Sequence, residues 1–195
     1  MLAKSSVCFL VVLFLCLSPA FSIDSTFGTS WGKSVEPIRL GVKVAKNPPA
    51  TTDEIFVYIE NESKDQLAIL NLGYIIGNGI SAFYSSLRMR AVNVQGESRV
   101  FQYAPPLAAV AGRRDPMIIP LMGGAMYASR LDLKRFIEDA TGQQFSSLPS
   151  GRYRVVISLE ATPVSKNEVN GAFDVALLKF WVGLLQTGEV EITVE

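Results

Sequence analysis

The sequence offers few side chains that could perform catalysis. It has no histidine among its 195 residues, and its only cysteines are Cys8 and Cys16. Without an imidazole there is no Ser–His–Asp triad and no histidine-ligated zinc or haem. Carboxylates remain as candidate acids and bases, and two of them can meet in a fold without any sequence signature. We therefore expect a non-catalytic protein that binds no cofactor and no metal, with a carboxylate-only enzyme as an alternative.

A dibasic segment is the first candidate for contact with a partner. Arg113 and Arg114 lie in a proline-containing stretch, residues 104–116, that is too long for a hairpin turn. Long loops in small domains often carry function. The two arginines could meet an acidic partner, or they could be offered to a trypsin-like protease by an inhibitor. The alternative is a solvated loop whose arginines only keep the surface soluble.

Aromatic side chains form the second candidate. Tyr74, Phe83 and Tyr84 flank an apolar, glycine-rich segment and could form a binding edge, or they could pack under the rim of a sheet. The segment 77–79 reads Gly-Asn-Gly, which lacks the G-x-G-x-x-G spacing and the following helix of a phosphate site. We predict no phosphate site there.

Two further patterns resemble sites but lack their other parts. Met117, Met122 and Met126 carry soft thioethers that suit Cu(I), yet no histidine accompanies them, and methionine commonly fills gaps in a core. Ser30 and Lys33 match the S-x-x-K motif, but they lie in a Gly/Ser-rich stretch rather than at the start of a helix. Neither pattern predicts a site.

Residues 1–22 have the features of a secretory signal peptide. Lys4 precedes an unbroken apolar run, residues 7–17, and small residues lead to a cleavage position after Ser22. Eleven apolar residues are too few to cross about 30 Å of hydrocarbon, so we expect no stable membrane insertion after cleavage. The protein is predicted to be secreted or periplasmic.

Composition narrows the range of partners. Lys and Arg number 18 and so do Asp and Glu, whereas a nucleic-acid-binding protein needs a basic face. Both cysteines lie in the predicted signal peptide, so no disulfide is expected in the exported chain, which favours a bacterial protein. The expected partner is an unidentified protein or envelope component.

Alternation of apolar and polar residues recurs along the chain and predicts antiparallel strands with one buried face. The alternating segments are 38–44, 55–59, 87–91, 153–159 and 190–194, and a short apolar run covers 67–72. We predict an all-β fold in which residues 38–195 form one immunoglobulin-like antiparallel β-sandwich. Residues 23–37 are predicted to be a flexible N-terminal extension.

One segment has a helical pattern. Asp132 is a plausible N-cap for residues 133–139, in which Phe136 and Ile137 would face inward. We predict one short connecting helix there. A helical stripe is also present in 172–185, but Trp181 and Gly183 favour a strand.

The last third of the chain carries a motif: Leu148-Pro149-Ser150-Gly151-Arg152-Tyr153-Arg154-Val155, then Phe180-Trp181-Val182-Gly183 and a final alternating strand. It resembles the C-terminal half of immunoglobulin-like β-sandwich domains in uncharacterised secreted bacterial proteins. The resemblance implies a fold and no catalytic residue, because fold does not determine function. We therefore expect a secreted binding or structural module, with a protease inhibitor acting through 104–116 as the alternative.

Overall fold

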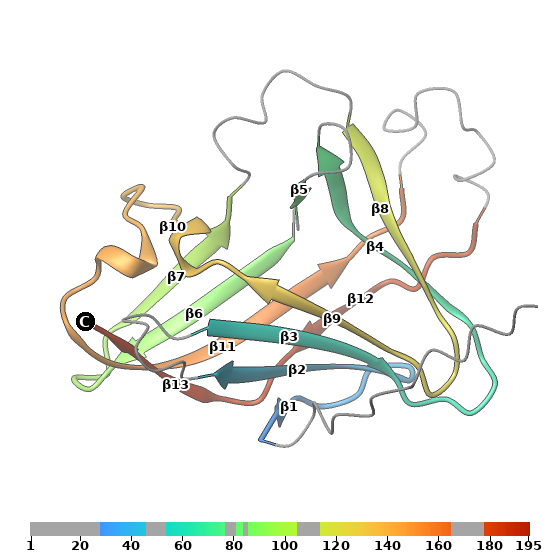
Figure 1. The fold of residues 1–195 in the computed structure, drawn as a ribbon, viewed down its shortest axis with the longest axis horizontal. Coiled ribbons are helices and arrows are strands. Elements are labelled where there is room, and N and C mark those ends of the chain that lie inside the picture. Colours follow the sequence, from blue (N-terminus) through green and yellow to red (C-terminus); the bar gives the residue numbers. More distant parts are fainter. Residues whose placement is uncertain (1–27, 46–53, 77–80, 84–85, 105–113, 165–177) are drawn as a thin grey trace, which may run out of the picture.

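The computed structural model describes residues 28–45, 54–76, 81–83, 86–104, 114–164 and 178–195 (Figure 1). In these ranges the regular secondary structure is β-strand, apart from two short 3₁₀ turns, η2 (Leu133–Arg135) and η3 (Phe145–Ser147). The strands are β1 (Ser30–Trp31), β2 (Ile38–Ala45), β3 (Glu54–Asn61), β4 (Ala68–Ile76), β5 (Ser81–Phe83), β6 (Leu87–Asn93), β7 (Ser98–Tyr103), β8 (Arg114–Leu121), β9 (Met126–Leu131), β10 (Phe136–Glu138), β11 (Gly151–Ala161), β12 (Gly183–Gln186) and β13 (Val190–Val194).

The described strands form three antiparallel sheets. A four-stranded sheet has the order β1-β2-β3-β9. A six-stranded sheet has the order β10-β7-β6-β11-β12, with β13 also paired to β11. The third sheet, β5-β4-β8, lies at one end of the molecule, and the four-stranded sheet lies across the six-stranded one (Figure 1). The predicted all-β, antiparallel fold is confirmed at this level.

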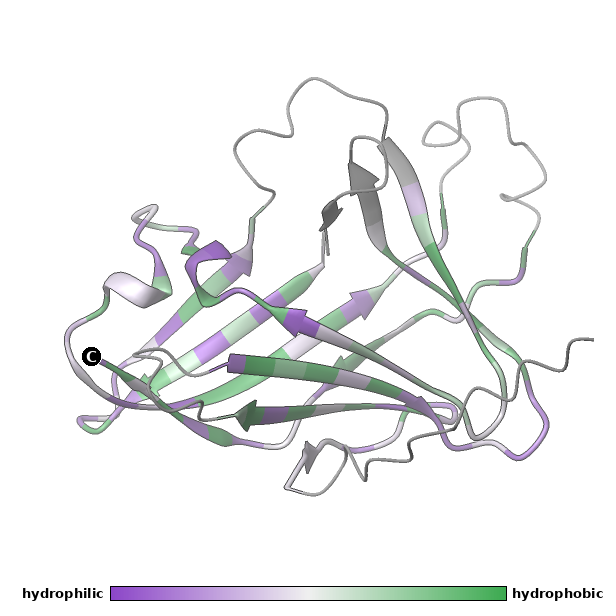
Figure 2. Ribbon diagram, viewed as in Figure 1, coloured by the Kyte–Doolittle hydropathy of each residue, from purple (hydrophilic) through white to green (hydrophobic). Residues whose placement is uncertain are grey.

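Strand β6 shows how the sequence pattern sets the faces of a sheet. Leu87, Met89 and Ala91 are buried, whereas Arg88 and Arg90 between them are exposed. Successive side chains of a strand point to opposite faces, so the alternation in sequence becomes an alternation in space. The alternating hydropathy is visible as bands along β6 (Figure 2).

The inward faces of the sheets share one hydrophobic core, which gathers residues that are far apart in the sequence. It includes Ile38, Leu40, Val57, Leu70, Met89, Phe101, Phe136, Phe145, Val155, Ile157 and Leu185. Since β11 pairs with β6 on one side and with β12 and β13 on the other, it holds the centre of the six-stranded sheet. Side chains on the outer face of β6 and β11 are therefore presented by strands that are paired on both edges.

The prediction of a helix over 133–139 is wrong beyond its first turn. Asp132 does cap a turn, and its side chain accepts a hydrogen bond from the Lys134 N–H at 3.0 Å. That turn ends at Arg135, and residues 136–138 continue as strand β10, paired with β7. Burial explains the change, because extended pairing places the fully buried ring of Phe136 against Tyr103, with ring centroids 5.0 Å apart.

Part of the predicted N-terminal extension lies within the described residues. Ser30 and Trp31 form β1, which pairs with Val42 and Gly41 of β2. The Trp31 ring lies over Gly41, where a Cβ atom would be only 2.6 Å from the indole, so this close approach requires glycine. Trp31 also stacks under the Arg39 guanidinium, 4.2 Å from the ring centroid.

Candidate functional site

The residues predicted as partner contacts do not come together as one described site. Arg113 and Tyr84 lie outside the described residues, as does most of the 104–116 segment. Arg114 begins β8, where its backbone is opposite Ile76 of β4. Tyr74 and Phe83 are directly opposite each other in the β4–β5 pair. The backbone thus places two of the three aromatic candidates side by side.

The two patterns without a predicted site are also separated by the fold. Met117 is buried in the core, whereas Met122 and Met126 are exposed, so the three thioethers do not share an environment. Ser30 belongs to a strand, and its hydroxyl donates to the Glu189 carbonyl oxygen at 3.0 Å. It does not start a helix, which the S-x-x-K motif would require.

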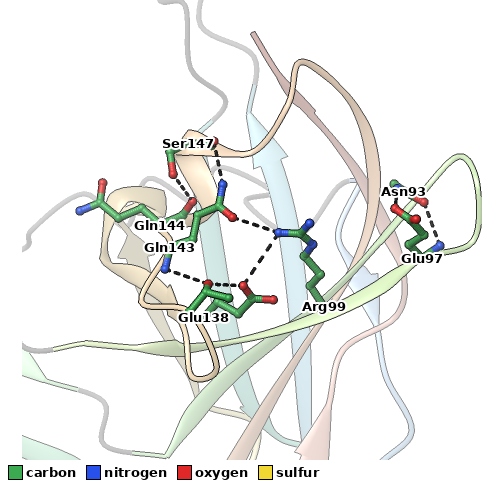
Figure 3. A network of polar contacts seen from close by, with 8 residues as sticks. Asn93, Glu97, Arg99, Glu138, Gln143, Gln144 and Ser147 are labelled. Carbon is green, nitrogen blue, oxygen red and sulfur yellow. Dashed lines mark hydrogen bonds and ion pairs between the residues drawn. The ribbon is translucent and has the colours of Figure 1, made fainter.

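A polar network closes one end of the six-stranded sheet (Figure 3). We call it the Arg99 network; it comprises Arg99, Glu138, Thr141, Gln143 and Ser147. The Arg99 guanidinium donates to Gln143 Oε1 at 3.0 Å and lies 3.9 Å from the Glu138 carboxylate. Thr141 donates to the same carboxylate, and Gln143 Nε2 donates to the Ser147 carbonyl oxygen at 3.1 Å. The members satisfy one another.

Aromatic packing anchors the segment that carries this network, residues 139–150, which we call the closing loop. Phe145 is fully buried and makes edge-to-face contacts with Phe101 and Tyr153, with centroids 5.5 and 5.8 Å apart. The Tyr153 hydroxyl donates to the Pro149 carbonyl oxygen at 2.9 Å. The buried ring of Phe145 therefore anchors the closing loop to the core.

A hollow of about 360 Å³ lies beside the closing loop. Its charged lining residues are Glu97, Arg99 and Arg152. Each already has a partner, because Glu97 accepts from Asn93 at 2.7 Å and Arg152 lies 3.6 Å from Glu191. A ligand here would have to displace these contacts, so the hollow is a poor binding site.

Tyr103 also has a charged partner within the fold. Its ring lies under the Arg135 guanidinium, 4.4 Å from the centroid. Burial raises the pKa of the Tyr103 hydroxyl, and the nearby positive charge of Arg135 offsets part of that rise. Burial likewise raises the pKa of Tyr58. Both hydroxyls stay protonated at neutral pH, and neither is placed as a general base.

A second hollow, of about 390 Å³, surrounds Trp181 and is flanked by the exposed side chains of Leu67 and Val182. The Trp181 indole donates to the Glu36 carbonyl oxygen and its backbone N–H donates to Ile69, both at 2.8 Å. The ring is therefore committed to joining the N-terminal segment to β4. We assign this tryptophan a structural role.

The outer face of the six-stranded sheet differs from all these regions. Cross-strand register places five side chains in one row over five strands: Ile137, Gln102, Arg88, Ser158 and Gln186. A second row beside it contains Val100, Arg90 and Val156. We call these eight side chains the arginine face. Arg88, Arg90, Val100 and Gln186 are exposed, and the others are half-buried.

The two arginines of this face lack the partners that other arginines have. Among the arginine side chains that the structure describes, five have a carboxylate within 4 Å: Arg39, Arg99, Arg130, Arg152 and Arg154. A sixth, Arg135, donates to the Ala104 carbonyl oxygen at 3.0 Å. The side chain of neither Arg88 nor Arg90 forms an ion pair or a hydrogen bond in the described chain.

The neighbours of Arg88 and Arg90 explain their lack of partners. Arg88 is flanked by Gln102 and Ser158, and Arg90 is flanked by Val100 and Val156, so no carboxylate is directly across from either guanidinium. Glu160 follows Ser158 at the next outward position of β11 but makes no ion pair within 4 Å in the described chain. The two guanidiniums keep their donors available to a bound group.

The alternation in sequence predicted that Arg88 and Arg90 lie on the solvent-exposed face of a strand, but it did not identify them as a binding site. The sequence signal was present in their i, i+2 spacing. What it lacked was the register with β7 and β11, since the uncharged neighbours come from residues 100–102 and 156–158.

Neither a cluster of metal ligands nor a membrane-spanning helix is found among the described residues. No cluster of three or more cysteine, aspartate or glutamate side chains is placed to hold a metal ion in that part of the chain. Nor do the described ranges contain a helix with the length and apolarity that crossing a membrane requires.

Comparisons with known proteins do not identify a class. No protein-family model matches the chain, and no curated protein or solved structure matches it. The site must therefore be interpreted from its own geometry.

Proposed function

We propose that this protein is a secreted, non-catalytic binding module with an immunoglobulin-like sandwich, and that it holds an anionic partner against the arginine face. The observation that supports the proposal is the pair of unpartnered guanidiniums of Arg88 and Arg90 on β6, a central strand that is paired on both edges. Arginine is well suited to this role because its planar fork matches carboxylate and phosphate geometry.

The absence of histidine from the sequence supports the non-catalytic part of the proposal. The apolar run of residues 7–17 supports export. The protease-inhibitor alternative depends on the 104–116 segment, most of which lies outside the described residues, so no observation favours it.

The chain provides a matched control for a binding test. Arg152 and Arg154 lie on the same face and on a neighbouring strand, but they pair with Glu191 and Glu189, each at 3.6 Å. The double variants R88Q/R90Q and R152Q/R154Q remove the same charge from the same face. The two variants differ in whether the guanidiniums that they remove had a carboxylate partner in the described chain.

The test is a calorimetric titration of the purified protein with two polyanions, polygalacturonate and poly-L-glutamate, at constant ionic strength. We expect at least one to bind. R88Q/R90Q should weaken that binding about tenfold or more, since each exposed ion pair contributes up to about 1 kcal/mol. R152Q/R154Q should change it by less than about twofold. Absence of binding to both polymers, or equal losses in the two variants, overturns the proposal.

A further inference from the structure

The first row of the arginine face also contains uncharged polar side chains. Gln102, Ser158 and Gln186 flank Arg88 on both sides, and none of their side chains forms a hydrogen bond within the described chain. Each glutamine amide has two donors and an acceptor, and the serine hydroxyl has both functions. Such groups match a ligand that carries many hydroxyls beside its anionic groups.

The direction of this row defines the shape of the ligand. The row runs across the strands, and neighbouring strands in a sheet lie about 4.7–4.9 Å apart. This spacing is close to the length of one pyranose unit in an extended polysaccharide. A chain laid along the row would place successive sugars over successive strands, so that the five strands from β10 to β12 receive about five units.

The second row complements the first. Arg90 lies two residues from Arg88 on β6, which separates their Cα atoms by about 6.6–6.8 Å and lets both guanidiniums reach the same chain. Val100 and Val156 flank Arg90 and offer apolar surface to the C–H face of a sugar ring. The eight side chains include no aromatic ring, so the face lacks the stacking platforms that single-stranded nucleic acids require.

We infer that the ligand of the arginine face is a polyuronate, an acidic polysaccharide whose sugars carry carboxylates. Arg88 and Arg90 pair with the carboxylates, and Gln102, Ser158 and Gln186 bond the ring hydroxyls. This inference rests on the function proposed above and specifies its ligand class. An acidic polypeptide would satisfy the two arginines but would leave the neutral row with fewer hydroxyl partners.

The experiment compares polygalacturonate with poly-L-glutamate on the purified protein and adds a variant of the neutral row, Q102A/Q186A. We expect polygalacturonate to bind more tightly, and Q102A/Q186A to weaken its binding about fivefold or more while leaving poly-L-glutamate binding within about twofold. The control is Gln95→Ala, an exposed glutamine in the β6–β7 turn that lies outside the arginine face. It should change neither titration.

The outcomes separate this inference from the proposed function. Binding of poly-L-glutamate through Arg88 and Arg90 without binding of polygalacturonate overturns the polyuronate assignment and leaves the proposed function standing. Polygalacturonate binding that Q102A/Q186A does not weaken also overturns the assignment, because the hydroxyl contacts are then absent. Failure of both polymers to bind overturns both proposals.

Discussion

Two arginine-containing regions on neighbouring strands of one sheet have opposite arrangements. On β7, Arg99 is tied to Glu138 and Gln143, and the partners are held in turn by Thr141 and Ser147 (Figure 3). One strand away on β6, Arg88 and Arg90 have exposed guanidiniums and no partner in the described chain. The residue type is the same in both regions, and the neighbouring side chains determine whether the guanidinium is paired within the fold.

Polar groups that stabilise the fold differ in their surroundings from polar groups that remain available to a ligand. The Glu138 side chain is only 12% exposed, so its charge needs the hydrogen-bond donors that surround it. Arg88 and Arg90 are solvated and need no partner for stability, because exposed ion pairs contribute about 0–1 kcal/mol. A group that is satisfied in the fold has little left for a ligand, whereas a group without a partner keeps its donors available to one.

The largest expected effect on stability is that of replacing Phe145, the buried ring of the closing loop. Phe145→Ala should lower the free energy of unfolding by about 3–5 kcal/mol, because it removes a fully buried ring that contacts Phe101 and Tyr153. Urea denaturation measures this loss. Val94→Ala is the control, since Val94 is 71% exposed in the adjacent hairpin turn and should change stability by less than about 0.5 kcal/mol. A loss below about 1 kcal/mol for Phe145→Ala would show that the closing loop is not part of the core.

A smaller effect on stability is expected when the arginines of the two regions are replaced. Arg99→Gln should cost about 1–2 kcal/mol of stability, because it leaves the largely buried Glu138 carboxylate with fewer donors. R88Q/R90Q should change stability by less than about 0.5 kcal/mol, since neither side chain has a partner to lose in the described chain.

Urea denaturation of both variants, with polygalacturonate titration of each, tests whether stability and binding separate. Arg99→Gln should keep its affinity for the polymer, and R88Q/R90Q should lose it. If R88Q/R90Q is as destabilised as Arg99→Gln, the contrast between the two regions is wrong.

Much of the fold was predictable because its signal is local. Alternation alone located β2, β3, β6, β11 and β13, since in each strand most apolar positions are buried and most positions between them are half-buried or exposed. The helix predicted at 133–139 is limited to one 3₁₀ turn because Phe136 and Ile137 fit both a helical stripe and a short strand. Pairing with β7, which no local pattern encodes, decided between them.

The candidate site was less predictable for the same reason. Outward-facing Arg88 and Arg90 followed from alternation, but whether each guanidinium meets a carboxylate depends on which residues are opposite in β7 and β11. Those partners are 10 to 70 residues away, from Val100 to Ser158.

The smallest expected effect concerns Glu160, the acidic residue nearest to the first row along β11. It is exposed, lies two residues beyond Ser158, and forms no ion pair in the described chain, so it repels a carboxylate held by Arg88. Glu160→Gln should therefore raise the affinity for polygalacturonate about twofold, the scale of a single exposed charge interaction. The control is Glu195→Gln, which removes the same charge from the exposed last residue of the chain.

The position of Glu195 makes it a distant control. It follows Val194, which is opposite Gly151, seven residues along β11 from Ser158. Seven residues of strand span about 23 Å, more than twice the Debye length of about 10 Å at 0.1 M salt, so Glu195→Gln should leave the affinity unchanged. Equal gains in the two variants would show that the polymer responds to the net charge of the protein. A gain confined to Glu160→Gln places its carboxylates beside Arg88, because only a local contact distinguishes two glutamates of equal charge.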